Sequence, residues 1–303
     1  NDDNENTYVI KRWILLFYRC YSYVGRQGYS QTVSLARNGC LYHSTVQHEL
    51  LHALGFNHEQ TRSDRDNHIQ VIWENISDDM KYNFNKINTL NQGTPYDYSS
   101  VMQYERYAFS KNGSPTMIPI PNNNAALGTS TEMSQNDIIR INRLYQCCIL
   151  PKQLCLGSFY RSLDTMFVTK VTFGLLALLF VFSVRAEDML LRTSLLSCLC
   201  LNCCTEPTEA SVLPEPDEPK LMDDIAVNER NADPCTSRGC LWPKYSDGKI
   251  YVPYVIANHY SSRELEIIKR GLDSFSYSTC IRFFPRSNER DYITIESRSG
   301  YET

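Results

Sequence analysis

The sequence predicts an α+β fold with a metal-binding helix at its centre. Three observations carry this prediction. Residues 48–59, HELLHALGFNHE, place two histidines one helical turn apart. Residues 261–280, SSRELEIIKRGLDSFSYSTC, have apolar side chains at helical spacing. Residues 20–43 and the segments CIRFFPR and DYITIES are rich in aromatic and β-branched residues, which is typical of strands.

The size and composition of the chain describe a globular protein. Its 303 residues, 42% hydrophobic and 21% charged, suffice for one large domain or two small ones. The net charge of -4 gives no reason to expect a nucleic-acid partner. Twelve cysteines are many for a cytosolic enzyme, so they favour an oxidising compartment and a secreted protein.

The segment 48–59 has the pattern of a catalytic zinc site. His48 and His52 leave the same face of a helix, and neutral imidazole nitrogens bind Zn²⁺ well. Gly55 can end the helix, so that the chain doubles back and brings His58 to the same ion. Three protein ligands leave one position open, and Glu49 is placed to act as the general base. We therefore expect one Zn²⁺ per chain; the alternative is an amphipathic helix with incidental histidines.

A helix is also expected over residues 134–146. Ser134 can cap its start, because a serine side chain accepts a hydrogen bond from the first turn. Its apolar face would consist of Ile138, Ile139, Ile141 and Leu144.

Three motifs together resemble the astacin family of metzincin zinc endopeptidases. They are HELLHALGFNHEQTRSDRD, SVMQY (100–104) and SQNDIIRINRLYQC, and the resemblance extends from Cys20 to Cys147. Within the family it is greatest to the fish hatching enzymes. The resemblance implies a zinc metalloendopeptidase that acts on extracellular protein or peptide substrates, with egg-envelope proteins as candidates.

The resemblance also implies roles for single residues. Ser100 and Met102 would form the Met-turn, with Met102 as an apolar floor below the metal. Tyr104 would be a further zinc ligand that swings away and stabilises the oxyanion; alternatively it is a surface aromatic. Glu59 would pair with the mature amino terminus, or else be a solvated acid. Substrate would lie antiparallel to the edge strand CYSYV, which begins at Cys20.

The front part of such a protease domain is found at the other end of the chain. Residues 231–256 resemble the start of a mature hatching-type enzyme, and in the family the residues after Gly300 would be those at 20–25. Residues 231–300 and 20–147 together have the length of one catalytic domain. The sequence therefore predicts this domain in permuted order.

A signal-like segment lies between the two halves. Residues 166–186 begin with Met, carry Lys170 and continue into an apolar run that ends at small residues. That run is shorter than the roughly 20 residues of a spanning helix, so a signal peptide is favoured over a membrane anchor, which would be the only source of membrane contact. We assign 148–165 as a spacer and 187–230 as a pro-segment.

The order of segments has two explanations. The simplest is the fusion of two neighbouring gene copies, the back half of one protease followed by the front half of another; the other is a true circular permutation. Residues 1–19 are an unassigned extension. If the halves do not assemble, the product would be a misfolded or merely zinc-binding chain without catalysis.

The pro-segment resembles the family's latency motif F-x-G-D, with its aspartate at Asp224. Such a carboxylate can occupy the open position of zinc. Leu221 and Asp223 stand where the motif has Phe and Gly, and the alternative is an ordinary acidic linker residue. Activation would cut the Arg230–Asn231 bond. The resemblance further implies three disulfides: Cys20–Cys40, Cys147–Cys280 and Cys235–Cys240.

Overall fold

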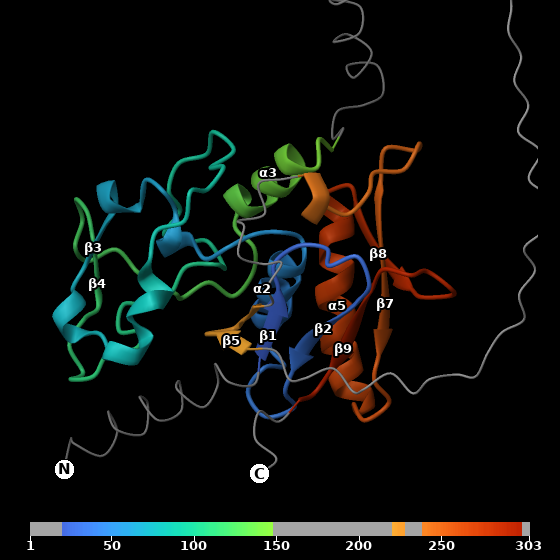
Figure 1. Ribbon diagram of the computed structural model, residues 1–303, viewed down its shortest axis with the longest axis horizontal. Coiled ribbons are helices and arrows are strands. Elements are labelled where there is room, and N and C mark those ends of the chain that lie inside the picture. Colours follow the sequence, from blue (N-terminus) through green and yellow to red (C-terminus); the bar gives the residue numbers. More distant parts are fainter. Residues whose placement is uncertain (1–19, 148–219, 228–237, 299–303) are drawn as a thin grey trace, which may run out of the picture. The chain divides into compact units, whose positions relative to one another are not determined.

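The computed structural model describes residues 20–147, 220–227 and 238–298, which all belong to one compact unit (Figure 1). The expectations for 1–19, 148–165 and 166–186, and those for most of 187–230, lie outside the described residues. Among the helices within these ranges, none is long and apolar enough to cross a membrane.

A seven-stranded mixed sheet combines strands from both ends of the chain, in the order β5-β6-β1-β2-β9-β7-β8. β2 pairs in parallel with β9, with Val33 opposite Ile295. Both side chains are fully buried. Successive side chains of a strand point to opposite faces of the sheet, and these two point to the face that is covered by the core. The strands are β1 (Cys20–Tyr23), β2 (Ser30–Leu35), β5 (Lys220–Met222), β6 (Ile225–Val227), β7 (Ile250–Ile256), β8 (Ile281–Pro285) and β9 (Tyr292–Glu296).

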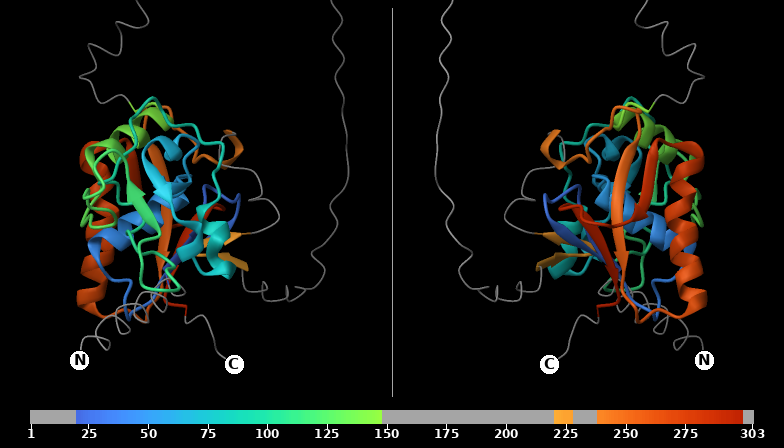
Figure 2. Two further views of the ribbon diagram at one scale, coloured as in Figure 1. Left: turned by 90° about the vertical axis from the view of Figure 1, so that its left-hand side faces the viewer. Right: turned by 90° about the vertical axis from the view of Figure 1, so that its right-hand side faces the viewer.

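The edge strand expected at residues 20–23 is covered in the structure. β1 lies between β2 and β6, and β6 runs parallel to it with Ser22 opposite Ile225. An exposed strand edge presents unpaired backbone groups, which an extended segment can satisfy. The segment that does so here comes from the expected pro-segment. In both side views of Figure 2, the amber strands β5 and β6 lie at the side of the fold opposite the orange-red helix α5.

Two helices pack against each other across the two parts of the chain. The helix α5 (Ser262–Ser278) begins at a capping box of Ser261 and Glu264, and it packs against α2 (His43–Ala53). The contact is close because Gly271 has no side chain: a Cβ there would lie 2.4 Å from Val46 Cγ1. A larger residue at 271 would therefore push the metal-binding helix away.

Residues 69–127 form a smaller, more irregular part. It contains the two-stranded sheet of β3 (Ile69–Val71) and β4 (Met117–Pro119), with its own apolar cluster around Phe84 and Met117. The helix α3 (Gln135–Leu144) starts at the capping box of Ser134 and Asp137. Short 3₁₀ helices are η1 (Glu59–Thr61), η2 (Arg65–Asn67), η3 (Trp73–Asn75), η4 (Asp78–Phe84) and η5 (Arg238–Cys240).

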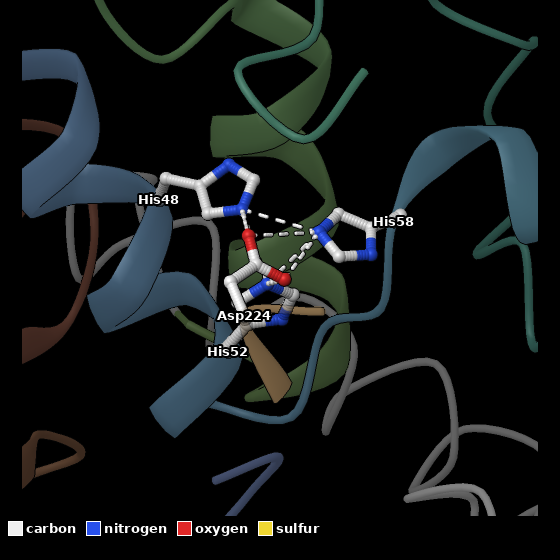
Figure 3. A group of neighbouring side chains, drawn as sticks. All are labelled: His48, His52, His58 and Asp224. Carbon is white, nitrogen blue, oxygen red and sulfur yellow. Dashed lines mark hydrogen bonds and ion pairs between the residues drawn. The ribbon is translucent and has the colours of Figure 1, made fainter. Parts of the chain in front are cut away.

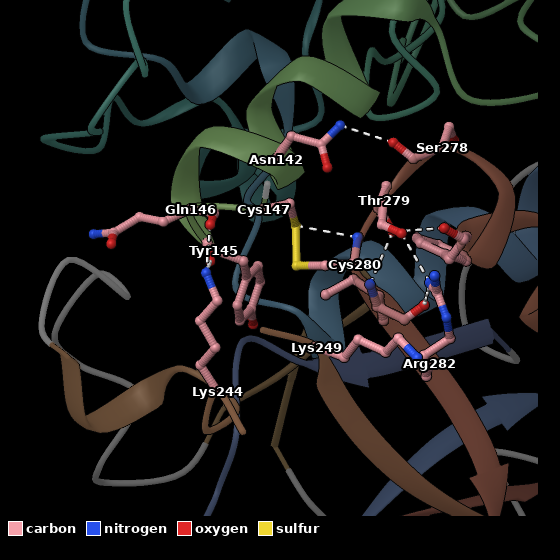
Figure 4. Close-up of a disulfide and its surroundings, with 12 residues drawn as sticks. Asn142, Tyr145, Gln146, Cys147, Lys244, Lys249, Ser278, Thr279, Cys280 and Arg282 are labelled. Carbon is pink, nitrogen blue, oxygen red and sulfur yellow. Dashed lines mark hydrogen bonds between the residues drawn. A yellow bond between two sulfur atoms is a disulfide. The ribbon is translucent and has the colours of Figure 1, made fainter. Parts of the chain in front are cut away.

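Two disulfides lie among the described residues. Cys20 is bonded to Cys40 and Cys147 to Cys280, with Cα–Cα distances of 5.8 and 5.2 Å. Figure 4 shows that the second bond ties the end of α3 to the start of β8, next to the hydrogen bond from Asn142 Nδ2 to the Ser278 carbonyl. Cys240 is also disulfide-bonded, and its expected partner Cys235 lies outside the described residues.

Candidate metal centre and active site

The three histidines expected as ligands converge on one point (Figure 3). α2 presents His48 and His52 on one face, and Gly55, with a φ of 103°, lets the chain turn back after the helix. His58 follows this turn. The Nε2 atoms are 3.1 Å apart for His48 and His52, 3.2 Å for His52 and His58, and 3.3 Å for His48 and His58.

The backbone fixes the tautomer of two of these rings. His48 Nδ1 donates to the Val101 carbonyl at 2.8 Å, and His52 Nδ1 donates to the Phe56 carbonyl at 2.7 Å. A neutral imidazole with its proton on Nδ1 has a lone pair on Nε2. Lone pairs that face one another need a cation between them. Tetrahedral Zn–N bonds of about 2.0–2.1 Å would separate the nitrogens by roughly 3.3 Å, so the residues fit zinc.

Asp224 completes the group from a distant part of the chain. It lies in the turn between β5 and β6, and its oxygens are 2.9 Å from His48 Nε2 and 3.0 Å from His58 Nε2. One ligand atom from each of the four residues lies within 4.8 Å of the others. A carboxylate in this place can take the fourth position of a tetrahedral ion.

The charges of these groups follow from burial and from one another. Burial lowers the pKa of His58 to about 4 and also lowers the pKa of His52, so both favour the neutral form that binds metal. Burial alone would lower the pKa of His48, but the Asp224 carboxylate outweighs it and raises that pKa. Burial would raise the pKa of Asp224, but the three histidines hold it well below its usual range.

Glu49 faces the same cavity without joining the four-residue group. It is 1% exposed, and its Oε2 has no hydrogen-bond partner among the described residues. Burial raises its pKa well above the usual range, and the Asp224 and Asp223 carboxylates raise it further. The cavity has a volume of ≈ 270 Å³, and its lining includes His48, Glu49, Tyr104 and Asp224. A carboxyl group with a free oxygen is thus available beside the histidines.

The turn at 100–104 contacts the site through the Val101 carbonyl, which accepts from His48 Nδ1. Met102 is buried, and its backbone N–H donates to Ser100 Oγ at 3.1 Å. Ser100 Oγ in turn donates to Asp137 Oδ1 at 2.6 Å, and the Val101 N–H donates to Asp137 Oδ2 at 3.0 Å. Sequence reasoning missed Asp137. Its place three residues after Ser134, in a capping box, was the available signal.

Tyr104 lies next to the histidines. Its ring centroid is 4.5 Å from that of His58, and its hydroxyl donates to Asp223 Oδ2. The structure thus buries this tyrosine at the site and does not leave it on the surface. Its expected role as a further metal ligand stays a prediction.

Glu59 has two arginine partners. Its carboxylate accepts from Arg140 Nη1 and Nη2 at 2.6 and 2.8 Å, from Arg62 Nη1 at 3.3 Å and from the Asp97 N–H at 2.7 Å. Glu59 is only 3% exposed, so it is not a solvated acid. Its expected pairing with a mature amino terminus at Asn231 concerns a residue outside the described ranges, and stays a prediction.

Arg140→Lys is expected to lower the free energy of unfolding by about 2 kcal/mol. A lysine cannot form the two parallel bonds to Glu59, so a buried carboxylate oxygen loses its partner. Urea denaturation would measure the change. Arg143→Lys is the matched control, because this arginine on α3 is exposed and its guanidinium donates to the Gln92 carbonyl, not to a buried carboxylate. Equal losses in both variants would contradict the prediction.

Comparison with known proteins gives consistent matches. The family profile described as Astacin, a peptidase family, matches residues 3–146 and 241–301, so its first part includes most of residues 1–19, the extension without an assignment from the sequence. The low choriolytic enzyme of Oryzias latipes is 55% identical over 128 residues, which are 42% of this chain and 47% of that protein. The zinc metalloproteinase nas-6 of Caenorhabditis elegans is 46% identical over 134 residues, 43% of this chain and 39% of that protein.

A solved structure is also similar. High choriolytic enzyme 1, a hatching enzyme zinc-protease from medaka, has a TM-score of 0.42 and 44% identity, covering 48% of this chain and 84% of that chain. The present chain spans about half the length of the curated choriolytic enzymes it matches.

Proposed function

Since the chain belongs to the astacin family of peptidases, we propose that it is a zinc-dependent endopeptidase. One observation carries the proposal: three imidazole nitrogens, two of them on buried histidines, converge at the spacing of zinc ligands, beside a carboxyl group with a free oxygen. Relatives named choriolytic and hatching enzymes make egg-envelope proteins the first substrates to test.

The proposed chemistry assigns a role to each side chain. His48, His52 and His58 hold the zinc ion, which when bound supplies a Lewis acid and lowers the pKa of water to about 7. Glu49 accepts a proton from the attacking water and passes it to the leaving amine. The Tyr104 hydroxyl donates to the developing oxyanion, and a fixed donor of this kind is worth several kcal/mol in the transition state.

The described conformation suits a latent form of such an enzyme. Asp224 lies among the histidines, where a carboxylate would compete with water for the ion. β6 lies along β1, where the resemblance places substrate, and it runs parallel to β1 and not antiparallel. Cleavage between Arg230 and Asn231 would free the pro-segment to leave.

One catalytic domain assembled from both ends of the chain is part of the proposal. The pairing of β2 with β9, the packing of α2 on α5 and the Cys147–Cys280 bond support it, as does the division of the family match into two segments. The disulfides also support secretion, since such bonds persist in oxidising compartments.

Metal analysis and processing test the proposed function together. The full chain, expressed by secretion and then cut with trypsin, is expected to contain one zinc per chain and to hydrolyse casein and egg-envelope protein. Chelation should abolish hydrolysis, added zinc should restore it, and His52→Ala should lose both metal and activity. Stoichiometric zinc without hydrolysis after complete cleavage at Arg230 would instead indicate a chain that only binds zinc.

A further inference from the structure

Asp223, the residue before Asp224, has a backbone conformation that normally belongs to glycine. Its φ is 61°, in the left-handed region, where a residue with a side chain is uncommon, although aspartate is among the more tolerant. The latency motif that this segment resembles has glycine at this position. Asp223 therefore places a side chain at a position where glycine would adopt the same backbone conformation at lower energy. Residues in such conformations cluster at functional sites, where the surrounding contacts hold them.

The carboxylate of Asp223 contacts Tyr104. The Tyr104 hydroxyl donates to Asp223 Oδ2 across 119 positions of sequence, and the two residues are 4% and 7% exposed. The ring of Tyr104 is held by other aromatic rings, with centroid distances of 4.5 Å to His58, 5.7 Å to Phe109 and 5.9 Å to Phe84. Asp223 thus meets the polar end of a side chain whose apolar part is already packed.

The two neighbouring acids have different targets. Asp224 belongs to the group of metal-ligating atoms with the three histidines, and Asp223 does not. The turn that joins β5 to β6 therefore carries one carboxylate to the metal centre and the other to the tyrosine beside it.

We propose that Asp223 is a second inhibitory residue, which holds the Tyr104 hydroxyl while Asp224 occupies the metal centre. The inference rests on the proposed function, in which Tyr104 donates to the oxyanion. While its hydroxyl is bonded to Asp223, it cannot make that donation. One turn of the pro-segment thereby blocks both the metal centre and the Tyr104 hydroxyl, and removal of the segment makes both available.

A double-mutant cycle in the full, uncleaved chain tests the contact. The zinc-loaded variants are Asp223→Gly, Tyr104→Phe and the double variant, with melting temperature as the readout. Tyr104→Phe should lower Tm by about 3 °C when Asp223 is present and leave Tm nearly unchanged in the Asp223→Gly background, because the lost hydrogen bond exists only in the first case. Relief of the backbone conformation by glycine is common to both arms and cancels. Asp223→Asn, which keeps an acceptor and tolerates the same φ, should retain most of the coupling. Additive shifts would overturn the proposal.

Residual hydrolysis by the uncleaved chain tests the inhibitory role. Asp223→Gly should raise the rate on a short peptide about tenfold, the equivalent of one net hydrogen bond, and Asp224→Ala serves as the positive control for loss of latency. Coupling in Tm without a change in this rate would overturn the inhibitory role. If the trypsin-cut wild-type chain hydrolyses nothing, the proposed function fails and the inhibitory role with it. The Tm cycle needs no catalysis and would still decide whether Asp223 holds Tyr104.

Discussion

Glu49→Gln is expected to reduce hydrolysis by the cleaved chain at least about 10³-fold while zinc remains stoichiometric. General acid–base catalysis contributes about 10²–10⁴-fold, and a glutamine amide cannot take a proton from water. Zinc should stay because Glu49 lies outside the group formed by His48, His52, His58 and Asp224. The side chain is buried and isosteric with glutamine, so the fold should be preserved. The measurements are the turnover of a peptide substrate and metal content.

The matched control is Glu132→Gln, an exposed carboxylate before α3. It should leave both turnover and zinc content unchanged. Unimpaired turnover by the Glu49 variant with a full complement of zinc would remove Glu49 from the proposed mechanism. Loss of zinc from that variant would instead mean that the buried carboxyl group is needed to maintain the ligand geometry.

Removal of the Cys147–Cys280 bond is expected to lower the free energy of unfolding by about 5 kcal/mol. In the chain-entropy account, a disulfide stabilises the fold by restricting the unfolded chain. The stabilisation grows with the number of residues in the loop that the disulfide closes. The sequence separation is 133 residues here and 20 residues for Cys20–Cys40, whose removal should cost about 3 kcal/mol. Urea denaturation of the Cys147→Ser/Cys280→Ser and Cys20→Ser/Cys40→Ser variants, followed by tryptophan fluorescence, would compare them.

The comparison also probes the assembly of the two parts of the chain. Trp242, 3% exposed, donates from Nε1 to the Ala53 carbonyl on the end of α2, so its part of the emission, which Trp13 and Trp73 share, reports the contact between residues 238–298 and residues 20–147. An equal or smaller loss for the longer loop would mean that the bond does not restrict these two parts. In that case the proposal of one domain assembled from both chain ends would lose one of its supports, the restriction imposed by this bond.

Local patterns in the sequence determined the helices that carry the site and the place of its histidines. The spacing of His48 and His52 on a helix, and the glycine that ends it, were enough to predict which imidazoles converge, because helical geometry depends on near neighbours. Ser134 marked the start of α3 for the same reason, since a cap bonds within its own first turn. The expected disulfide Cys147–Cys280 came from resemblance and not from any local pattern.

Only the tertiary structure decided which distant groups meet. Asp137 fastens the Met-turn to α3, Arg140 bonds Glu59, and Asp223 bonds Tyr104, each across at least 36 positions of sequence. The covering of β1 by β6 likewise depends on which segment satisfies an open strand edge. These choices arise because buried polar groups need partners, and packing selects those partners from the whole chain. A local pattern shows that a carboxylate is available, but only the assembled fold determines which donor it meets.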